Sequence, residues 1–357
     1  MGLSPYAHSL PQPNIMKILT LIHKDSVVSN YRQVRPLVEM LGAKVQRSLL
    51  KKTETIELGE LAKRFKKKCD VLNIKYIDDK HTLDVLYSMR NQAKFKAVVD
   101  IDDLLWSIPV GNPAMGDANQ HANRIFALTG SVQCADWITV STHPIYTALK
   151  PLNSNIAVLP NYLDLSEWKH PRGKHKSVRI GWVWSPTHIP DMHIVEGALH
   201  KIQKKYGDKV EIVIFGTTLD VFKGLKTTNI AGVKYDKYPE TFMKAGIDIS
   251  IAPLADNDFN KCKSNIKWLE STMAGAAFIG SKVYPYEHSV KDGKTGYLAK
   301  SEAQWVKRME FLIENPEKRA ELVKNAKKDV VKLNEESKQK WLDFYAYLDG
   351  EIKKEKI

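Results

Sequence analysis

Cysteine is scarce in this chain, and its three residues, Cys69, Cys134 and Cys262, lie far apart in the sequence. Their spacing matches neither a disulfide framework nor a cysteine-rich zinc site. Histidines and carboxylates show no recognisable metal-ligand spacing either. We therefore expect a reducing cytoplasm, no metal site and no resident cofactor.

Long apolar runs are absent as well. No run approaches the roughly 20 residues that cross a bilayer. The first residues, MGLSPYAHSLPQPN, lack the basic segment followed by an apolar one that is typical of a secretory signal. Hydrophobic residues make up 43% of the 357 residues, which is enough for sizeable cores. The length fits two domains of ordinary size, so the sequence predicts a soluble two-domain enzyme.

Acidic residues are outnumbered, because 54 Lys and Arg stand against 41 Asp and Glu, for a net charge of +13. Such a balance favours polyanionic partners, either nucleic acid or an anionic membrane surface. The densest basic cluster runs from Lys63 to Lys68. An excess of lysine is also common on solvated surfaces, so charge alone does not select a partner.

The order of apolar runs predicts an α/β protein with two similar halves, in which short buried strands alternate with helices. Strands are expected at 16–22, 71–76, 97–101, 137–141 and 156–160, then at 178–183, 210–215, 247–251 and 277–279. Helices are expected at about 30–41 and 192–206. The polar segment 168–177 separates the halves. This order predicts two Rossmann-like domains that face a central cleft. Open parallel sheets bind ligands at the carboxyl ends of their strands, so the ligand site is expected in that cleft.

One stretch in the second half, FNKCKSNIKWLESTMAGAAFIGS (259–281), reads as a loop, a helix and a buried strand. Ser264 is a candidate helix cap, and Gly275 ends the helix. A helix start offers free N–H groups to an anion, with Lys263 and Lys267 adding positive charge. Glu270 lies further along and could accept hydrogen bonds from the two hydroxyls of a ribose. The stretch therefore suits a nucleoside diphosphate, although a helix whose charges face solvent is the alternative.

This stretch resembles the donor-site motif of GT-B glycosyltransferases, especially the retaining enzymes of family 4. Their pattern has two glutamates separated by seven residues; Glu270 matches the second, and Cys262 stands in place of the first. The resemblance implies that Glu270 contacts the donor ribose, and it leaves the handling of the transferred sugar open. The implied donor-binding residues are Ser185, Thr187, His188, Lys263, Ser264, Asn265, Lys267 and Glu270.

The resemblance covers nearly the whole chain. VLPNYLDLSEW (158–168) is similar to the segment that closes the family's first domain, and RIGWVWSPTHIPD (179–191) to the start of its donor domain. It implies an acceptor domain at 1–170, a donor domain at 171–336, and a C-terminal helix at 337–357 that crosses back to the first domain.

A second constellation, VVDIDDLLWSIP (98–109), places three carboxylates at a strand exit. Like charges at such a place perturb one another, so one carboxyl could act as a base or stay protonated. Asp102 and Asp103 align with a His-Asp pair of the family and are the candidate catalytic residues, whereas a structural role for Asp100 is equally open. The candidate acceptor-binding residues are Asn30, Arg32 and Trp106.

The implied activity is transfer of a sugar from a nucleoside diphosphate sugar, with UDP as the expected nucleotide and retention of configuration. The sequence also resembles glycosyltransferases encoded by phages and bacteria, and some of the phage enzymes modify hydroxymethylated bases in DNA. We therefore expect double-stranded DNA as acceptor, and host cytoplasm as the location if a phage encodes the chain. Two alternatives are a membrane-surface enzyme acting on a lipid-linked or cell-surface glycan, and a non-catalytic binding module. No obligate protein partner is indicated.

Overall fold

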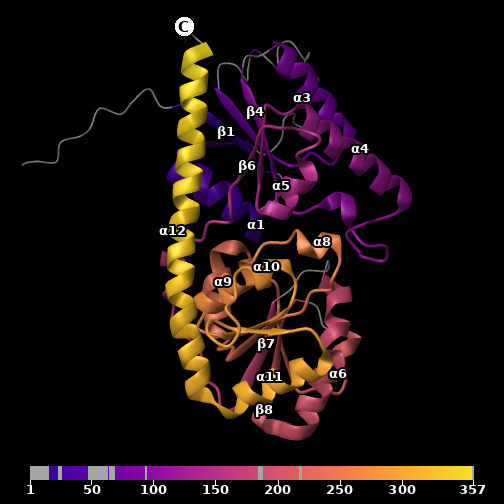
Figure 1. The fold of residues 1–357 in the computed structure, drawn as a ribbon, viewed down its shortest axis with the longest axis vertical. Helices are drawn as coiled ribbons and strands as arrows, with labels where there is room; N and C mark the ends of the chain where they lie inside the picture. Colours follow the sequence, from indigo (N-terminus) through magenta and orange to yellow (C-terminus); the bar gives the residue numbers. More distant parts are fainter. Residues whose placement is uncertain are drawn as a thin grey trace, which may run out of the picture.

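The computed structural model describes residues 16–22, 26–46, 63, 69–92, 95–183, 188–216 and 219–355. Within them the chain forms two parallel sheets of six strands each, one above the other in Figure 1. Helices flank both sheets, and each sheet is built from its own stretch of sequence. The predicted α/β class with two Rossmann-like halves is confirmed.

The first sheet has the order β2-β1-β3-β4-β5-β6, with every pair parallel. Its central strands are apolar and buried on both faces, as parallel strands covered by helices must be. The strands are β1 (Ile18–Leu21), β2 (Lys44–Gln46), β3 (Val71–Lys75), β4 (Lys96–Ile101), β5 (Trp137–Val140) and β6 (Ile156–Val158). The helices are α1 (Val27–Ser29), η1 (Asn30–Met40), α3 (Lys80–Gln92), η2 (Leu105–Ser107), α4 (Ala118–Cys134), α5 (His143–Leu149) and η3 (Leu165–Trp168).

The second sheet has the order β12-β11-β10-β7-β8-β9 and is again parallel. Its strands are β7 (Val178–Val183), β8 (Val210–Phe215), β9 (Thr227–Ile230), β10 (Ile249–Ala252), β11 (Ala277–Ser281) and β12 (Tyr297–Ala299). Its helices are α6 (Ile189–Tyr206), η5 (Gly207–Lys209), η6 (Asp220–Phe222), η7 (Tyr235–Lys237), α7 (Tyr238–Lys244), α8 (Asp258–Lys261), α9 (Ile266–Met273), α10 (Tyr284–Glu287) and α11 (Glu302–Glu314). Gly275, with φ of +82°, ends α9 as predicted.

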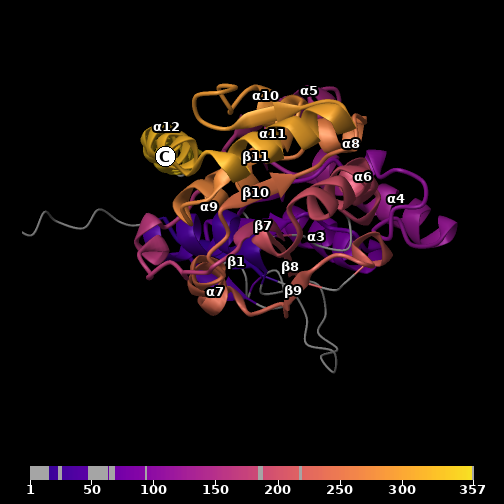
Figure 2. The same cartoon turned by 90° about the horizontal axis from the view of Figure 1, so that it is seen from below.

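A single long helix, α12 (Pro316–Glu355), runs beside both sheets (Figures 1 and 2). Leu322 packs into the core of the second domain, whereas Trp341 and Leu348 pack against the first sheet. The crossing helix that the sequence placed at 337–357 is therefore the second half of a longer element. The proposed domain boundaries at 170 and 336 otherwise stay a prediction.

Candidate active site

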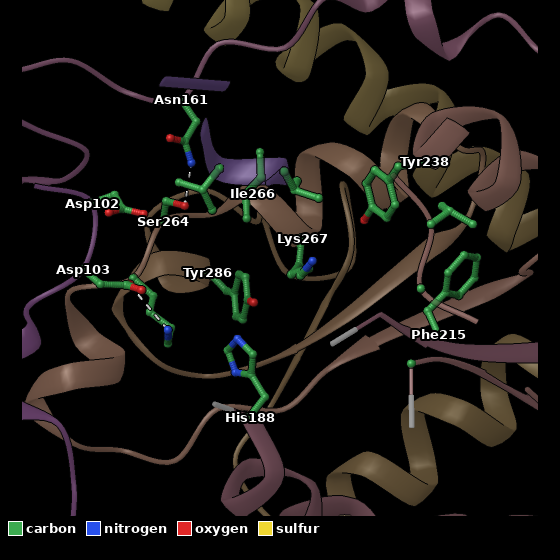
Figure 3. Close-up of a pocket in the computed structure, with 16 residues that line it drawn as sticks. Asp102, Asp103, Asn161, His188, Phe215, Tyr238, Ser264, Ile266, Lys267 and Tyr286 are labelled. Carbon is green, nitrogen blue, oxygen red and sulfur yellow. Dashed lines mark hydrogen bonds and ion pairs between the residues drawn. The ribbon is translucent and has the colours of Figure 1, made fainter. Parts of the chain in front are cut away.

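A cavity of about 320 Å³ lies between the two domains (Figure 3). Its lining residues follow the carboxyl ends of strands in both sheets, which is where open parallel sheets bind ligands. Asp102 and Asp103 lie at one end in Figure 3, and Phe215 and Tyr238 at the other. The lining comprises Val27, Val28, Asp102, Asp103, Asn161, His188, Phe215, Gly216, Gly232, Val233, Tyr238, Lys263, Ser264, Ile266, Lys267 and Tyr286.

The turn before α9 supplies much of the polar wall. Lys263 and Ser264 lie in this turn, and Lys267 lies in the first turn of the helix. Ser264 is not the helix cap, contrary to the sequence prediction. The N-cap is Asn265, and the Ser264 hydroxyl accepts a hydrogen bond of 2.9 Å from the Asn161 amide of the first domain. Because Ser264 is fixed across the cleft, the polar turn faces the cavity.

Asn265, predicted to bind the donor, does not line this cavity. Its amide donates to the Ser289 hydroxyl at 2.8 Å, and its side chain lines a smaller cavity of about 180 Å³ beside α12. Pairing with Ser289 turns the side chain away from the main cavity. The two cavities share Asn161, Lys263 and Ser264.

Lys263 connects the two domains electrostatically. Its Nζ atom lies 3.4 Å from Asp103 Oδ1 and 4.3 Å from the centre of the Phe259 ring. Cys262, which replaces the first glutamate of the motif, packs into an apolar cluster of the first domain, and its carbonyl accepts a hydrogen bond from the Thr142 hydroxyl. Burial raises the pKa of the Cys262 thiol to about 11, so position 262 supplies no negative charge near neutral pH.

Glu270 lies behind the cavity wall, which differs from its predicted position beside a ribose. Its side chain is fully buried, and each carboxylate oxygen already accepts a tyrosine hydroxyl: Oε1 that of Tyr31 at 3.0 Å, and Oε2 that of Tyr238 at 3.1 Å. Lys267 also donates to Oε2 at 3.2 Å. A ribose reaches Glu270 only if a tyrosine hydroxyl gives way.

His188 lines the cavity, and its ring points into it (Figure 3). The Nδ1 atom lies 2.9 Å from Asp191 Oδ2, and the second oxygen of this buried carboxylate accepts two further hydrogen bonds. Burial lowers the pKa of the His188 imidazole; Asp191 opposes this effect, and Lys263 and Lys267 reinforce it. The imidazole is therefore uncharged near neutral pH and held in one orientation.

Asp100 has a structural role. It is fully buried and accepts hydrogen bonds from Arg32 through both oxygens, at 2.7 and 2.5 Å, and from the Thr139 hydroxyl at 2.6 Å. Such a bidentate, hydrogen-bonded pair satisfies the charge of both partners.

Asp102 and Asp103 line the cavity, as a candidate catalytic pair should. Asp102 Oδ2 lies 3.4 Å from Lys75, while Oδ1 is buried and has no hydrogen-bond partner among the described residues. Burial raises the pKa of Asp102, Asp103 and Asp100 raise it further, and Lys75 and Arg32 oppose the rise. The cluster thus holds one carboxylate with a buried oxygen that has no hydrogen-bond partner among the described residues.

The three predicted acceptor residues do not line the cavity. Arg32 is completely buried in its pair with Asp100, so it cannot touch an acceptor. Asn30 is buried and donates to the Ser26 carbonyl at 2.9 Å at the start of η1. Trp106 is partly buried, and its indole donates to the Thr129 hydroxyl at 3.0 Å. The first domain lines the cavity with Val27, Val28, Asn161 and the two aspartates.

Ser185 and Thr187, and Arg64 to Lys68 of the basic cluster, lie outside the described residues. Sequence reasoning also missed Lys75, Asp191, Tyr31 and Tyr238. Asp191 follows His188 by one helical turn, a spacing that could have suggested the pair. Nothing in the sequence links the two tyrosines to Glu270, because those contacts form only in the folded chain.

Residues 193–329 match the family model described as glycosyl transferases group 1. Sucrose-phosphate synthase from Thermosynechococcus elongatus is similar in structure, with a TM-score of 0.67, 13% identity and 93% and 98% of the two chains covered. HepE from Anabaena, solved with UDP and glucose, gives a TM-score of 0.62, 15% identity and coverage of 90% and 98%. The chain has the GT-B fold of these enzymes, and its residues 193–329 match the group 1 glycosyl transferase model. No curated protein sequence matches it significantly.

Within the described residues, no group of three or more His, Cys, Asp or Glu side chains is arranged to hold a metal ion. The positive charge beside the cavity comes from Lys263 and Lys267.

No helix in the described part of the chain is both long and apolar enough to span a bilayer.

Proposed function

We propose that the cavity binds a nucleoside diphosphate sugar, with UDP as the nucleotide. The observation that carries this proposal is the convergence of Lys263, Lys267 and His188 on one interdomain cavity. Two lysines and the free N–H groups at the start of α9 suit a diphosphate. The opposite end, with Phe215 and Val233, suits a nucleobase. The relative HepE, solved with UDP and with UDP-glucose, supports the choice of nucleotide.

The proposed reaction transfers the sugar with retention of configuration. The bond between the anomeric carbon and the diphosphate breaks, and its electron pair leaves with the diphosphate. The acceptor oxygen bonds to the same face of the anomeric carbon, and its proton moves to the departing diphosphate oxygen. Lys263 and Lys267 stabilise the charge on the leaving group. Asp102 accepts a hydrogen bond from the acceptor hydroxyl and offsets the positive charge that develops on the sugar.

For the acceptor, we propose a hydroxymethylated base in double-stranded DNA. The net charge of +13 supports a polyanionic acceptor, because phosphate contacts supply most non-specific affinity for DNA. Trp106 is not the stacking group of this proposal, since it does not line the cavity. Glycosylation of hydroxymethylated DNA should weaken steeply with salt; a flat salt response, or transfer only to glycans on anionic vesicles, would identify the membrane-surface alternative.

The identity of the donor is tested by measuring the melting temperature of the protein in the presence of UDP, GDP, ADP and their sugars. A ligand that binds only the folded protein raises the melting temperature by mass action. We expect a UDP-specific increase that Lys267→Met reduces and Lys282→Met, at an exposed lysine paired with Glu287, preserves. No increase with any nucleotide would overturn the proposal. Analysis of the anomeric configuration of the product by NMR tests retention.

A further inference from the structure

Lys75 is a largely buried lysine that does not line the donor cavity, so donor binding does not explain its position. It is the last residue of β3 and lies directly beside Asp100 in the parallel ladder with β4. This register brings its Nζ atom to 3.4 Å from Asp102 Oδ2 and to 5.4 Å from the centre of the Tyr76 ring. The side chains of Lys75 and Asp102 are only 16% and 10% exposed. Lysine is seldom buried unless it is paired, so the fold holds Lys75 in this position through its pair with Asp102.

The three carboxylates at the end of β4 and in the following turn each have their own cation. Asp100 pairs with Arg32, Asp103 with Lys263 and Asp102 with Lys75. Of these, Asp100 is satisfied and Asp103 faces the second domain.

Asp102 combines an oxygen that is paired with Lys75 and a buried oxygen that has no partner among the described residues. Oδ2 faces Lys75, Oδ1 is without a partner among the described residues, and the residue lines the cavity. A buried carboxylate oxygen without a partner is rare, because leaving it unsatisfied costs about 1–3 kcal/mol. A ligand hydroxyl in the cavity would satisfy it.

We propose that Lys75 is a positioning residue: it anchors Asp102 through Oδ2 and presents Oδ1 to the hydroxyl of the acceptor. This proposal rests on the proposed function, since it assigns Asp102 Oδ1 to the acceptor of that reaction. Lys75 itself touches neither substrate.

The charges around Asp102 explain why such a residue is needed. Asp100 and Asp103 face it from β4 and the following turn, Tyr76 follows β3, and Arg32 approaches from η1. The Ser141 hydroxyl after β5 donates to the Asp102 carbonyl, not to its carboxylate. Burial lowers the pKa of Lys75, but the surrounding carboxylates outweigh this effect and hold it above the usual value. Lys75 therefore remains charged and favours the ionised form of Asp102.

The test compares Lys75→Met, Lys75→Arg and wild type in the pH profile of kcat/KM for glycosyl transfer. Without the cation the pKa of Asp102 rises, so the acidic limb of the profile moves to higher pH. We expect kcat/KM on that limb to fall by up to about tenfold in Lys75→Met for each unit by which the pKa of Asp102 rises. Lys75→Arg should restore the wild-type profile. Unchanged acidic limbs in all three proteins would overturn the proposal.

A matched control is Lys80→Met, which breaks an exposed Lys–Asp pair on α3 and should leave the profile unchanged. Binding of UDP, followed by thermal shift, should be the same in Lys75→Met and wild type, because Lys75 does not line the donor cavity. A loss of UDP binding in Lys75→Met would mean a general structural role and would contradict the proposal.

A second readout needs no substrate. A carboxyl whose pKa is raised on folding favours the folded state at low pH and disfavours it once ionised. The stability lost in Lys75→Met should therefore be largest above the pKa of Asp102 and shrink as the pH falls through it, and Asp102→Asn should abolish this dependence. A pH-independent loss would overturn the pairing. If wild type transfers no sugar but the dependence appears, the proposed function fails while the Lys75–Asp102 pair stands.

Discussion

Burial and two neighbouring lysines lower the pKa of the His188 imidazole, which points into the cavity beside them. A bound diphosphate would add negative charge next to this ring and raise its pKa. Donor binding then takes up a proton, so a nucleotide sugar should bind more tightly as the pH falls from about 8 to about 6. We expect the Kd of UDP-glucose, whose diphosphate does not titrate there, to fall by up to about tenfold for each unit by which binding raises the pKa of His188. Calorimetry in buffers of different ionisation enthalpy measures both effects.

His188→Gln should remove this pH dependence because glutamine does not titrate. His193→Gln is the matched control: it changes an exposed histidine on α6 that pairs with Glu196. A pH dependence that survives in His188→Gln would assign the proton to another group.

Some roles of individual residues could be predicted from the sequence, and others could not. The turn before α9 and the aspartates after β4 were found because strand exits and helix starts are readable from apolar patterns. Asn30 and Arg32 were misjudged because both lie in η1 and are used by the fold: Asn30 donates to the Ser26 carbonyl, and Arg32 pairs with the buried Asp100. The pairing of Arg32 joins residues 68 positions apart, so the sequence does not reveal it.

At the scale of elements, buried polar side chains of α12 form hydrogen bonds with the segment between the two domains. The Asn334 amide accepts a hydrogen bond from the Leu163 N–H and donates to the Leu163 carbonyl, both at 2.9 Å. Asn334→Leu keeps the size but leaves both backbone groups without a partner. We expect a loss of about 2–4 kcal/mol in the free energy of unfolding. Urea unfolding measures it, with Glu335→Ala on the exposed face as control; a loss below about 0.5 kcal/mol would mean that water replaces the amide.

The strands that the sequence did not reveal all lie at sheet edges. The predicted central strands agree with β1, β3, β4, β5, β7, β8, β10 and β11 to within a few residues. The missed strands are β2, β9 and β12, and each lies at the edge of its sheet. Edge strands are short and partly exposed, so they lack the continuous apolar run that marks a buried parallel strand. The length of α12 was also underestimated, since the sequence placed the crossing helix at 337–357 and the helix begins at Pro316.

At the scale of the whole molecule, the two domains meet on the segment 262–270. Four contacts cross the cleft there: Thr142 to the Cys262 carbonyl, Asp103 to Lys263, Asn161 to Ser264, and Tyr31 to Glu270. The sequence predicted two facing domains but none of these pairs, since each joins residues more than 100 positions apart. The segment that carries the motif is thus also the surface on which the domains meet, so we expect ligand binding to be coupled to the contact between them.

Tyr31→Phe tests this coupling and the role of Glu270 together. The change removes only the hydroxyl, so Glu270 Oε1 loses its donor and the free energy of unfolding should fall by about 1–3 kcal/mol. If a ribose hydroxyl can take the place of the tyrosine hydroxyl, UDP should raise the melting temperature of Tyr31→Phe more than that of wild type.

The matched ligand is 2′,3′-dideoxy-UDP, which keeps the base and the diphosphate but lacks both ribose hydroxyls. It should stabilise the two proteins equally, because it has no hydroxyl to offer Glu270. If UDP raises the melting temperature of both proteins equally, Glu270 keeps its hydrogen bonds with the tyrosine hydroxyls and only stabilises the contact between the domains. In that case the ribose binds at the cavity wall formed by Tyr238 and Lys267, and the second glutamate of the motif serves the architecture of this enzyme, not its donor.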